Sequence, residues 1–151
     1  RAVWSNLQLI GKGQYMTMTA LCISDKQVVY AGLHQSLLIF RAATQTVQEL
    51  ESQGIWLGML DEIEGLNADR CVEFAPGDGL LLFTDGLIET RRAADQTFID
   101  IAPVMERYAA ESCQARSCEE IAQSIMALTA AGIVRDDISV VALRRLGAQR
   151  R

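Results

Sequence analysis

Residues 76–89 read PGDGLLLFTDGLIE, and this stretch combines a turn, an apolar run and a carboxylate. Proline presets φ at the second position of a turn and glycine permits a positive φ, so PGDG (76–79) predicts a tight turn that includes Asp78. LLLFT (80–84) predicts a fully buried strand. Asp85 and Gly86 follow where this strand ends. The stretch therefore raises the question whether Asp85 belongs to a turn or binds a ligand.

The sequence upstream predicts further strands. YMTMTALCIS (15–24) alternates large apolar and small polar residues, as a half-buried strand does, and QVVYA (27–31) follows a short turn and is expected to return antiparallel. SLLIFR (36–41) predicts a third strand, and RCVEFA (70–75), which alternates again, predicts another. This part of the chain therefore predicts an antiparallel sheet.

Downstream the apolar period becomes helical. A helix is expected from about Asp100, and Ser117 with Glu120 forms a capping-box signature for a second helix, which Gly132 is expected to end. DISVVALRR (137–145) is the last predicted strand. A run of strands, two helices and a closing strand predict an α+β fold with mainly antiparallel sheet.

Length and charge exclude several classes of protein. The 151 residues suit one domain, and no apolar stretch approaches the roughly 20 residues that span a bilayer. The net charge of −5 argues against a nucleic-acid surface, and the basic residues at 147–151 are expected to form a solvated tail. No leader is apparent, so we expect a cytoplasmic protein. Because the chain begins with Arg1 rather than Met, we expect it to be part of a longer one.

The residues available for chemistry are mainly acidic. His34 is the only histidine, none of the four cysteines lies in a C-x-x-C pair, and no G-x-S-x-G motif is present. Asp85 leaves one predicted strand and Asp136 enters another, so both would lie at one sheet edge if these strands are antiparallel neighbours. Two close carboxylates suit Mg²⁺ or Mn²⁺, but both positions also fit ordinary turns, which spacing alone favours. The residues alone leave both interpretations open.

Four ordered segments resemble one family. EFAPGDGLLLFTDGLIETR (73–91) closely resembles the metal-dependent Ser/Thr phosphatases of the PPM (protein phosphatase 2C) class, in their bacterial branch related to stage II sporulation protein E. RDDISVVAL (135–143), YAGLHQSLLIF (30–40) and GIWLG (54–58) resemble further segments of that family in the same order. The resemblance implies a PPM-type sandwich of antiparallel sheets flanked by helices.

The resemblance also implies a metal site. By position in the family's motifs, Asp85 and Asp136 are the metal ligands, and Thr84, Gly86 and Asp137 support them. The intact domain of the family holds two Mn²⁺ or Mg²⁺ ions, which activate a water to hydrolyse phosphoserine or phosphothreonine.

Substrates and partners follow from the same resemblance. The family's bacterial branch acts on small phosphorylated regulators of the anti-anti-sigma type, and the phosphatase usually follows a sensory or regulatory domain. The segment 87–99 is the expected place for a substrate-recognition flap. Candidate substrate-binding residues are His34, Glu89 and Arg91, each of which is also compatible with a structural or solvated role.

One departure from the family limits these expectations. Nothing in residues 1–30 resembles the early acidic residue or the D-x-s-G-H-G segment that completes the family's two-metal site. We therefore expect residues 1–146 to form the C-terminal part of one phosphatase domain, with an incomplete metal site and little turnover alone. The alternative is a catalytically incomplete regulatory or protein-interaction module that keeps the fold.

Overall fold

The computed structural model describes residues 6, 15–60 and 68–147, which form two compact units. The first unit comprises Arg1–His34 and Glu51–Glu73, and the second comprises Gln35–Leu50 and Phe74–Arg151. Each unit is therefore built from two separate stretches of the chain. Residues 7–14 and most of the expected basic tail, 148–151, lie outside the described residues.

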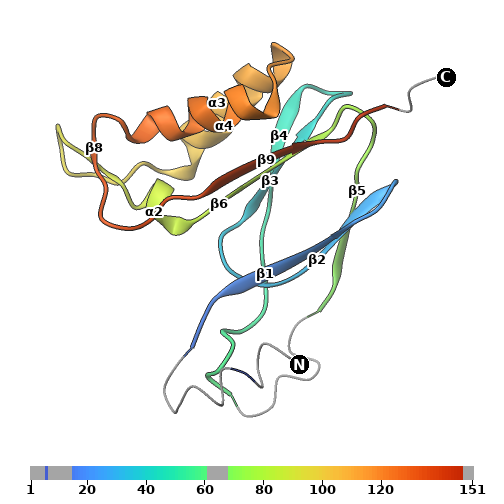
Figure 1. The fold of residues 1–151 in the computed structure, drawn as a ribbon, viewed down its shortest axis with the longest axis horizontal. Helices are drawn as coiled ribbons and strands as arrows, with labels where there is room; N and C mark the ends of the chain where they lie inside the picture. Colours follow the sequence, from blue (N-terminus) through green and yellow to red (C-terminus); the bar gives the residue numbers. More distant parts are fainter. Residues whose placement is uncertain (1–5, 7–14, 61–67, 148–151) are drawn as a thin grey trace. The chain divides into compact units, whose positions relative to one another are not determined.

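The first unit contains a three-stranded antiparallel sheet in the order β1-β2-β5 (Figure 1). The strands are β1 (Met18–Ile23), β2 (Gln27–Leu33) and β5 (Arg70–Glu73). β1 and β5 fall within the predicted segments, β2 extends two residues past the predicted 27–31, and the antiparallel return after residue 26 is confirmed. Val28 and Tyr30 of β2 are buried on one face of this sheet.

The second unit contains a four-stranded antiparallel sheet in the order β4-β3-β6-β9. Its strands are β3 (Leu37–Arg41), β4 (Thr46–Leu50), β6 (Gly79–Phe83) and β9 (Val140–Arg144). β6 is the buried run LLLF of the opening stretch, and it lies between β3 and β9 as a central strand. Successive side chains point to opposite faces of the sheet, and Leu80, Leu81 and Phe83 are buried while Leu82 is half-buried, which accounts for the continuous apolar run.

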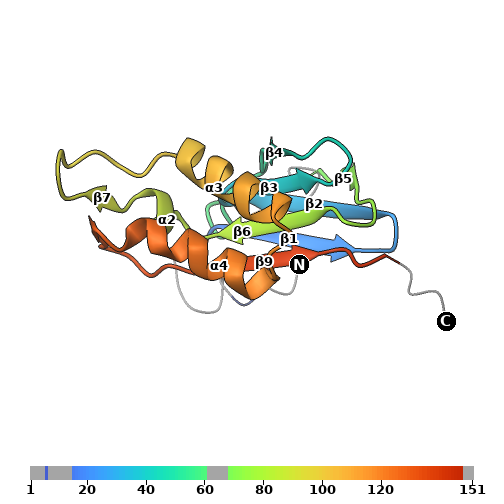
Figure 2. The same cartoon turned by 90° about the horizontal axis from the view of Figure 1, so that it is seen from above.

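Two helices lie against this sheet, as Figure 2 shows. α3 (Ile101–Cys113) packs on β3 and β4, whereas α4 (Cys118–Met126) packs on β9. The predicted capping box of Ser117 and Glu120 is complete, and Asp100, near which a helix was expected to begin, is an N-cap whose side chain accepts from the Ile101 N–H. The buried core of this unit joins the sheet to the helices through Leu38, Phe40, Leu81, Phe83, Leu87, Ile99, Val104, Tyr108, Ile121 and Ile125. The predicted α+β class with antiparallel sheets is confirmed.

The prediction for Gly132 was wrong. α4 ends at Met126, a short 3₁₀ turn (Ala127–Thr129) follows, and Gly132 begins β8 (Gly132–Ile133), which pairs antiparallel with β7 (Arg91–Arg92). A Cβ at Gly132 would lie 2.4 Å from the Thr90 Cγ2 atom and 3.1 Å from the Arg91 carbonyl oxygen. Glycine is required there for the close approach of two chain segments and not as a helix cap.

Asp78 has a larger role than the predicted turn residue. Its N–H does close the turn by donating to the Ala75 carbonyl at 3.0 Å. Its carboxylate, however, is 2% exposed and accepts three further hydrogen bonds, from the Ala75 N–H, the Ala42 N–H and the Arg41 guanidinium. The turn before β6 is thereby tied to the end of β3.

None of the helices within the described ranges has the length and apolar character that crossing a bilayer requires.

Candidate metal centre

The edge of the second unit's sheet brings the two predicted metal ligands together. β6 and β9 are antiparallel neighbours with Phe83 opposite Val140. The ladder continues past this pair, because the Thr84 N–H donates to the Ser139 carbonyl at 3.1 Å. Asp85, which follows β6, and Asp136, which precedes β9, therefore lie at the same sheet edge. The condition on which the sequence-based pairing depended is met.

The Thr84 side chain joins the end of β6 to the segment before β9 through two hydrogen bonds, to Asp137 and Ser139, which together are called the Thr84 clip. Its hydroxyl donates to the Asp137 carbonyl at 3.0 Å and accepts from the Ser139 N–H at 2.9 Å. The backbone of Thr84 has the extended conformation of an N-cap (φ −90°, ψ 160°), yet its hydroxyl makes no capping bond to the helix that follows. The hydroxyl is used across the strands instead, and this fixes the segment before β9 against the end of β6.

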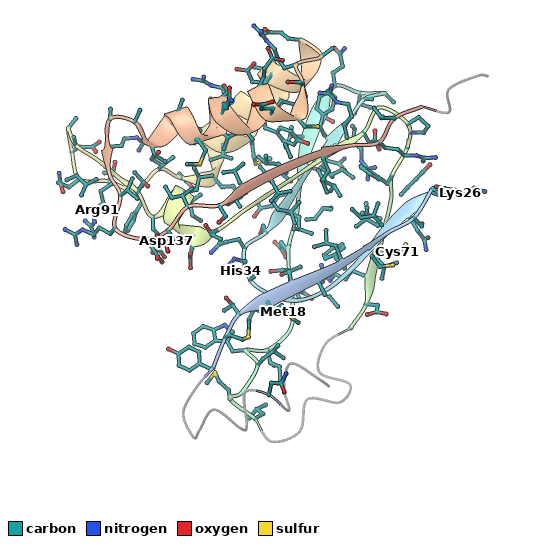
Figure 3. All side chains as sticks on the ribbon, in the orientation of Figure 1. Met18, Lys26, His34, Cys71, Arg91 and Asp137 are labelled. Carbon is teal, nitrogen blue, oxygen red and sulfur yellow. The ribbon has the colours of Figure 1, made fainter. Side chains whose placement is uncertain are left out.

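A one-turn helix, α2 (Asp85–Ile88), which the sequence analysis did not predict, carries Asp85. A Cβ on Gly86 would lie 2.6 Å from the Asp137 carbonyl oxygen and 3.0 Å from that of Asp136, so α2 is packed directly on the backbone before β9. Figure 3 shows Asp137 beside this helix. The absence of a side chain at Gly86 lets these two backbone segments meet. The buried Thr90 hydroxyl donates to the Gly86 carbonyl at 2.8 Å and holds the other end of α2.

The two carboxylates differ in exposure. Asp85 is half-buried and its Oδ1 atom accepts from the Gly86 N–H at 3.1 Å. Asp136 is exposed and its Oδ1 atom accepts from the Asp137 N–H at 2.8 Å. Within the part of the chain that the structure describes, no donor reaches the second oxygen of either carboxylate. Each side chain is thus oriented by one bond and keeps one oxygen for a further ligand.

This pair fits a hard divalent cation. Carboxylate oxygens are the donors that Mg²⁺ and Mn²⁺ prefer, and Mg²⁺ is often held by only one or two carboxylates together with water and substrate phosphate. Among residues 15–60 and 68–147, no group of three or more His, Cys, Asp or Glu residues is arranged to hold a metal. By themselves, Asp85 and Asp136 could therefore supply only part of a coordination shell.

The predicted residues Glu89 and Arg91 share a cavity with Asp136. They line a cavity of about 170 Å³, whose other walls are Gly86, Phe98, Arg135 and Asp136. In the segment 87–99, expected to form a flap, the chain leaves α2 and folds back into a small hairpin, in which Arg91 forms a β-bridge with Phe98 and the Arg92 N–H donates to the Thr97 carbonyl. On its other side β7 pairs with β8. Arg135 and Phe98 were missed by the sequence analysis. The position of Arg135 directly before Asp136 was an available signal, whereas Phe98 enters the site only through the hairpin pairing.

His34 belongs to the first unit. Its Nδ1 atom shares a hydrogen bond of 2.9 Å with the Thr17 hydroxyl, and its N–H donates to the Ser52 hydroxyl at 3.2 Å. The Ser52 hydroxyl in turn donates to the His34 carbonyl at 2.8 Å. These hydrogen bonds give His34 a structural role at the end of β2. Its assignment to substrate binding stays a prediction.

Comparison with known proteins agrees with this architecture. Residues 4–146 match the family model of stage II sporulation protein E (SpoIIE). A comparison with curated protein sequences finds no match.

Solved structures share the fold at low sequence identity. The SiaA PP2C domain of Pseudomonas aeruginosa has a TM-score of 0.76 at 20% identity, over 93% of this chain and 56% of that one. The RsbU and RsbW domains of a Mycobacterium tuberculosis protein give 0.74 at 22%, over 96% and 40%. The Mn-presoaked phosphatase domain of the cell fate determinant SpoIIE from Bacillus subtilis gives 0.61 at 17%, over 91% and 59%.

These chains are longer than the present one, which spans between 40% and 59% of their length. At such identities the likeness establishes the fold, and it supports a PP2C-like architecture for the strands and helices described above. The family model covers nearly the whole sequence, from residue 4 to residue 146. The chain therefore belongs to the stage II sporulation protein E family and has the fold of PP2C-like phosphatase domains.

Proposed function

We propose that this chain is part of a metal-dependent protein serine/threonine phosphatase, which hydrolyses phosphoserine or phosphothreonine on a bacterial regulatory protein of the anti-anti-sigma type. The observation that carries the proposal is the Thr84 clip, which holds Asp85 beside the segment that contains Asp136. Family membership supplies the reaction class. The fold shared with an RsbU domain and with the phosphatase domain of a cell fate determinant supports a regulatory substrate.

Each residue of the site has a defined part in this proposal. Asp85 and Asp136 would hold Mn²⁺ or Mg²⁺ through the carboxylate oxygens that have no donor among the described residues. The metal, when bound, lowers the pKa of a water and neutralises charge on the phosphate. Thr84 and Gly86 keep the two ligands in register, and Asp137 contributes its backbone carbonyl to the clip rather than its carboxylate.

We further propose that residues 1–146 correspond to the C-terminal part of one phosphatase domain. The chain spans 56–59% of the SiaA and SpoIIE domains, which supports a part of such a domain, and the C-terminal placement rests on the family motifs that residues 73–91 and 135–143 resemble. Two carboxylates leave most coordination positions of a divalent ion to water, substrate or other protein groups. A sensory or regulatory domain in the same protein would be the partner that controls the reaction. We place the reaction in the cytoplasm, where thiols stay reduced, because all four cysteines are free.

The test uses the protein in its full-length form with a generic aryl phosphate and Mn²⁺. Asp85→Asn and Asp136→Asn should each reduce hydrolysis about 100-fold or more and weaken Mn²⁺ binding measured by titration calorimetry, while EDTA should abolish the activity. Asp25→Asn, at an exposed turn between β1 and β2, is the matched control and should change neither value.

Two results would redirect the proposal. If both carboxylate variants kept full activity and full Mn²⁺ affinity, the metal assignment would be wrong. If the full-length protein bound a phosphorylated partner but hydrolysed neither it nor the aryl phosphate, the chain would be the regulatory or interaction module set out above as the alternative.

A further inference from the structure

The cavity beside the candidate metal centre is lined by side chains of both charges. Arg91 and Arg135 contribute two positive charges, and Glu89 and Asp136 contribute two negative ones. In the proposed function the charge of Asp136 is taken up by the metal, which leaves one net positive charge in the lining. The remaining lining residues are Gly86 and the ring of Phe98.

Arg91 is held in place at this cavity by two contacts. Its Nη1 atom donates to the Gln96 carbonyl at 3.3 Å, and its guanidinium carbon lies 4.6 Å from the centre of the Phe98 ring. Stacking on an aromatic face restrains a guanidinium while leaving its remaining N–H groups directed at solvent or ligand. The β-bridge between Arg91 and Phe98 fixes the backbone on which this pair stands. Arg91 therefore presents a partly preorganised cation, and Figure 3 shows it in the hairpin region beside α2.

Arg135 is exposed and directly precedes Asp136. Among the described residues, no carboxylate forms an ion pair with Arg135 or with Arg91, in contrast to Arg41 and Arg116, which both have acidic partners. Two guanidinium groups on one small cavity are a suitable receptor for a carboxylate, because Arg binds this group in a bidentate geometry.

We propose that this cavity, the acidic-residue pocket, binds the side chain of an aspartate or glutamate next to the phosphorylated residue of the substrate. The proposal rests on the proposed function, since the pocket shares Gly86 and Asp136 with the candidate metal centre. A single carboxylate matches the one net positive charge of the lining. The phosphate that reacts carries more negative charge and would face Glu89 there, so its place is on the metal ligands.

The test is a set of phosphoserine peptides with an otherwise uncharged sequence, in which one Asp is moved through the positions flanking the phosphoserine. Each Asp peptide is compared with its Asn counterpart. With Mn²⁺ present, one position should raise kcat/KM about tenfold, which corresponds to about 1.4 kcal/mol. Arg135→Ala and Arg91→Ala should each reduce this preference, and Arg135→Glu should shift it toward a peptide with Lys at that position.

The control measurements separate recognition from chemistry. Hydrolysis of a small aryl phosphate, which has no flanking residue, should fall much less in the arginine variants than the peptide preference does, and Arg107→Ala on α3 should leave the peptide preference intact. Circular dichroism confirms that each variant is folded. A wild-type protein without any Asp preference would overturn the proposal. A parallel loss of aryl phosphate hydrolysis would also overturn it, because the arginines would then bind the reacting phosphate.

Peptide binding to the Asp85→Asn variant distinguishes failure of this inference from failure of the proposed function. Fluorescence anisotropy with Mn²⁺ present measures affinity without turnover. If the Asp peptide binds about tenfold more tightly than the Asn peptide while the wild-type protein hydrolyses nothing, the acidic-residue proposal is supported and the phosphatase proposal is wrong. If hydrolysis occurs but binding shows no preference, the pocket falls and the phosphatase proposal stands.

Discussion

Replacing Asp78 by alanine tests whether the buried carboxylate holds the second unit together. Its Oδ1 atom accepts from the Ala42 N–H at 2.9 Å, and its Oδ2 atom accepts from the Ala75 N–H and from Arg41 Nη1, both at 3.0 Å. The Asp78 side chain is 3% exposed and that of Arg41 is 21% exposed. The substitution therefore removes the acceptor from two backbone donors and the counter-charge from a largely buried guanidinium.

The magnitude follows from these contacts. A buried donor left without an acceptor costs about 1–3 kcal/mol, and breaking a buried ion pair costs about 3–5 kcal/mol. In the variant, Arg41 keeps the hydrogen bond from its Nε atom to the Gln48 side chain at 3.2 Å and some contact with water, which lowers the cost of losing the ion pair. We therefore expect Asp78→Ala to lower the free energy of unfolding by about 3–4 kcal/mol, a large part of the roughly 5–15 kcal/mol of a typical domain. Tm should fall by about 10 °C.

Urea unfolding followed by far-UV circular dichroism is the appropriate assay, because the longer helices, α3 and α4, belong to the same unit as Asp78. Asp78→Asn should recover little, since its amide N–H₂ would meet donors. The exposed Asp25→Ala variant should stay within about 0.5 kcal/mol of the wild type. A loss below about 1 kcal/mol for Asp78→Ala would contradict a stabilising role of the carboxylate and mean that water replaces it.

Three further substitutions test close contacts and a helix cap. Gly86→Ala should lower the free energy of unfolding by roughly 1–3 kcal/mol and weaken Mn²⁺ binding, because its Cβ would lie 2.6 Å from a backbone oxygen. Gly147→Ala is the control and should change neither stability nor Mn²⁺ affinity, since no atom lies within 4 Å of its Cβ. Equal effects of the two substitutions would show that the close packing of α2 is unimportant. Gly79→Ala should also destabilise the protein in urea unfolding, since its Cβ would lie 2.6 Å from the Tyr108 hydroxyl oxygen. Tyr108→Phe should recover part of that loss in the double variant, and strict additivity would contradict the assigned contact. Ser117→Ala should lower the free energy of unfolding by about 1 kcal/mol through loss of the α4 cap, and an unchanged urea midpoint would count against the capping box.

Local chemistry made much of the fold predictable. The alternation in residues 15–24 and 27–31 produced neighbouring antiparallel strands, and the apolar run after PGDG produced a central strand. The capping box at Ser117 and Glu120 formed as expected, because both of its bonds join residues three positions apart. Such features depend on nearest neighbours and therefore appear directly in the order of residues.

Other features depend on contacts that no local pattern contains. Gly132 resembles a helix stop, but its neighbour in space is Thr90. Arg135 reaches the acidic-residue pocket because β8 pairs with β7 and brings the start of the β9 segment beside the hairpin. The buried contacts of Asp78 with Ala42 and Arg41 join residues more than thirty positions apart.

At the candidate metal centre, some features follow from the order of residues and others only from tertiary packing. The order of residues predicts that one carboxylate follows a buried strand and that another precedes the last strand, because strand ends and turns are encoded in residues that are adjacent in the chain. From spacing alone, turns were the favoured interpretation of Asp85 and Asp136. The pairing of β6 with β9 and the bridge by the Thr84 hydroxyl arise only when distant segments pack together. Register between distant strands is set by the packing of whole faces, so the distance between two carboxylates is a property of the folded sheet.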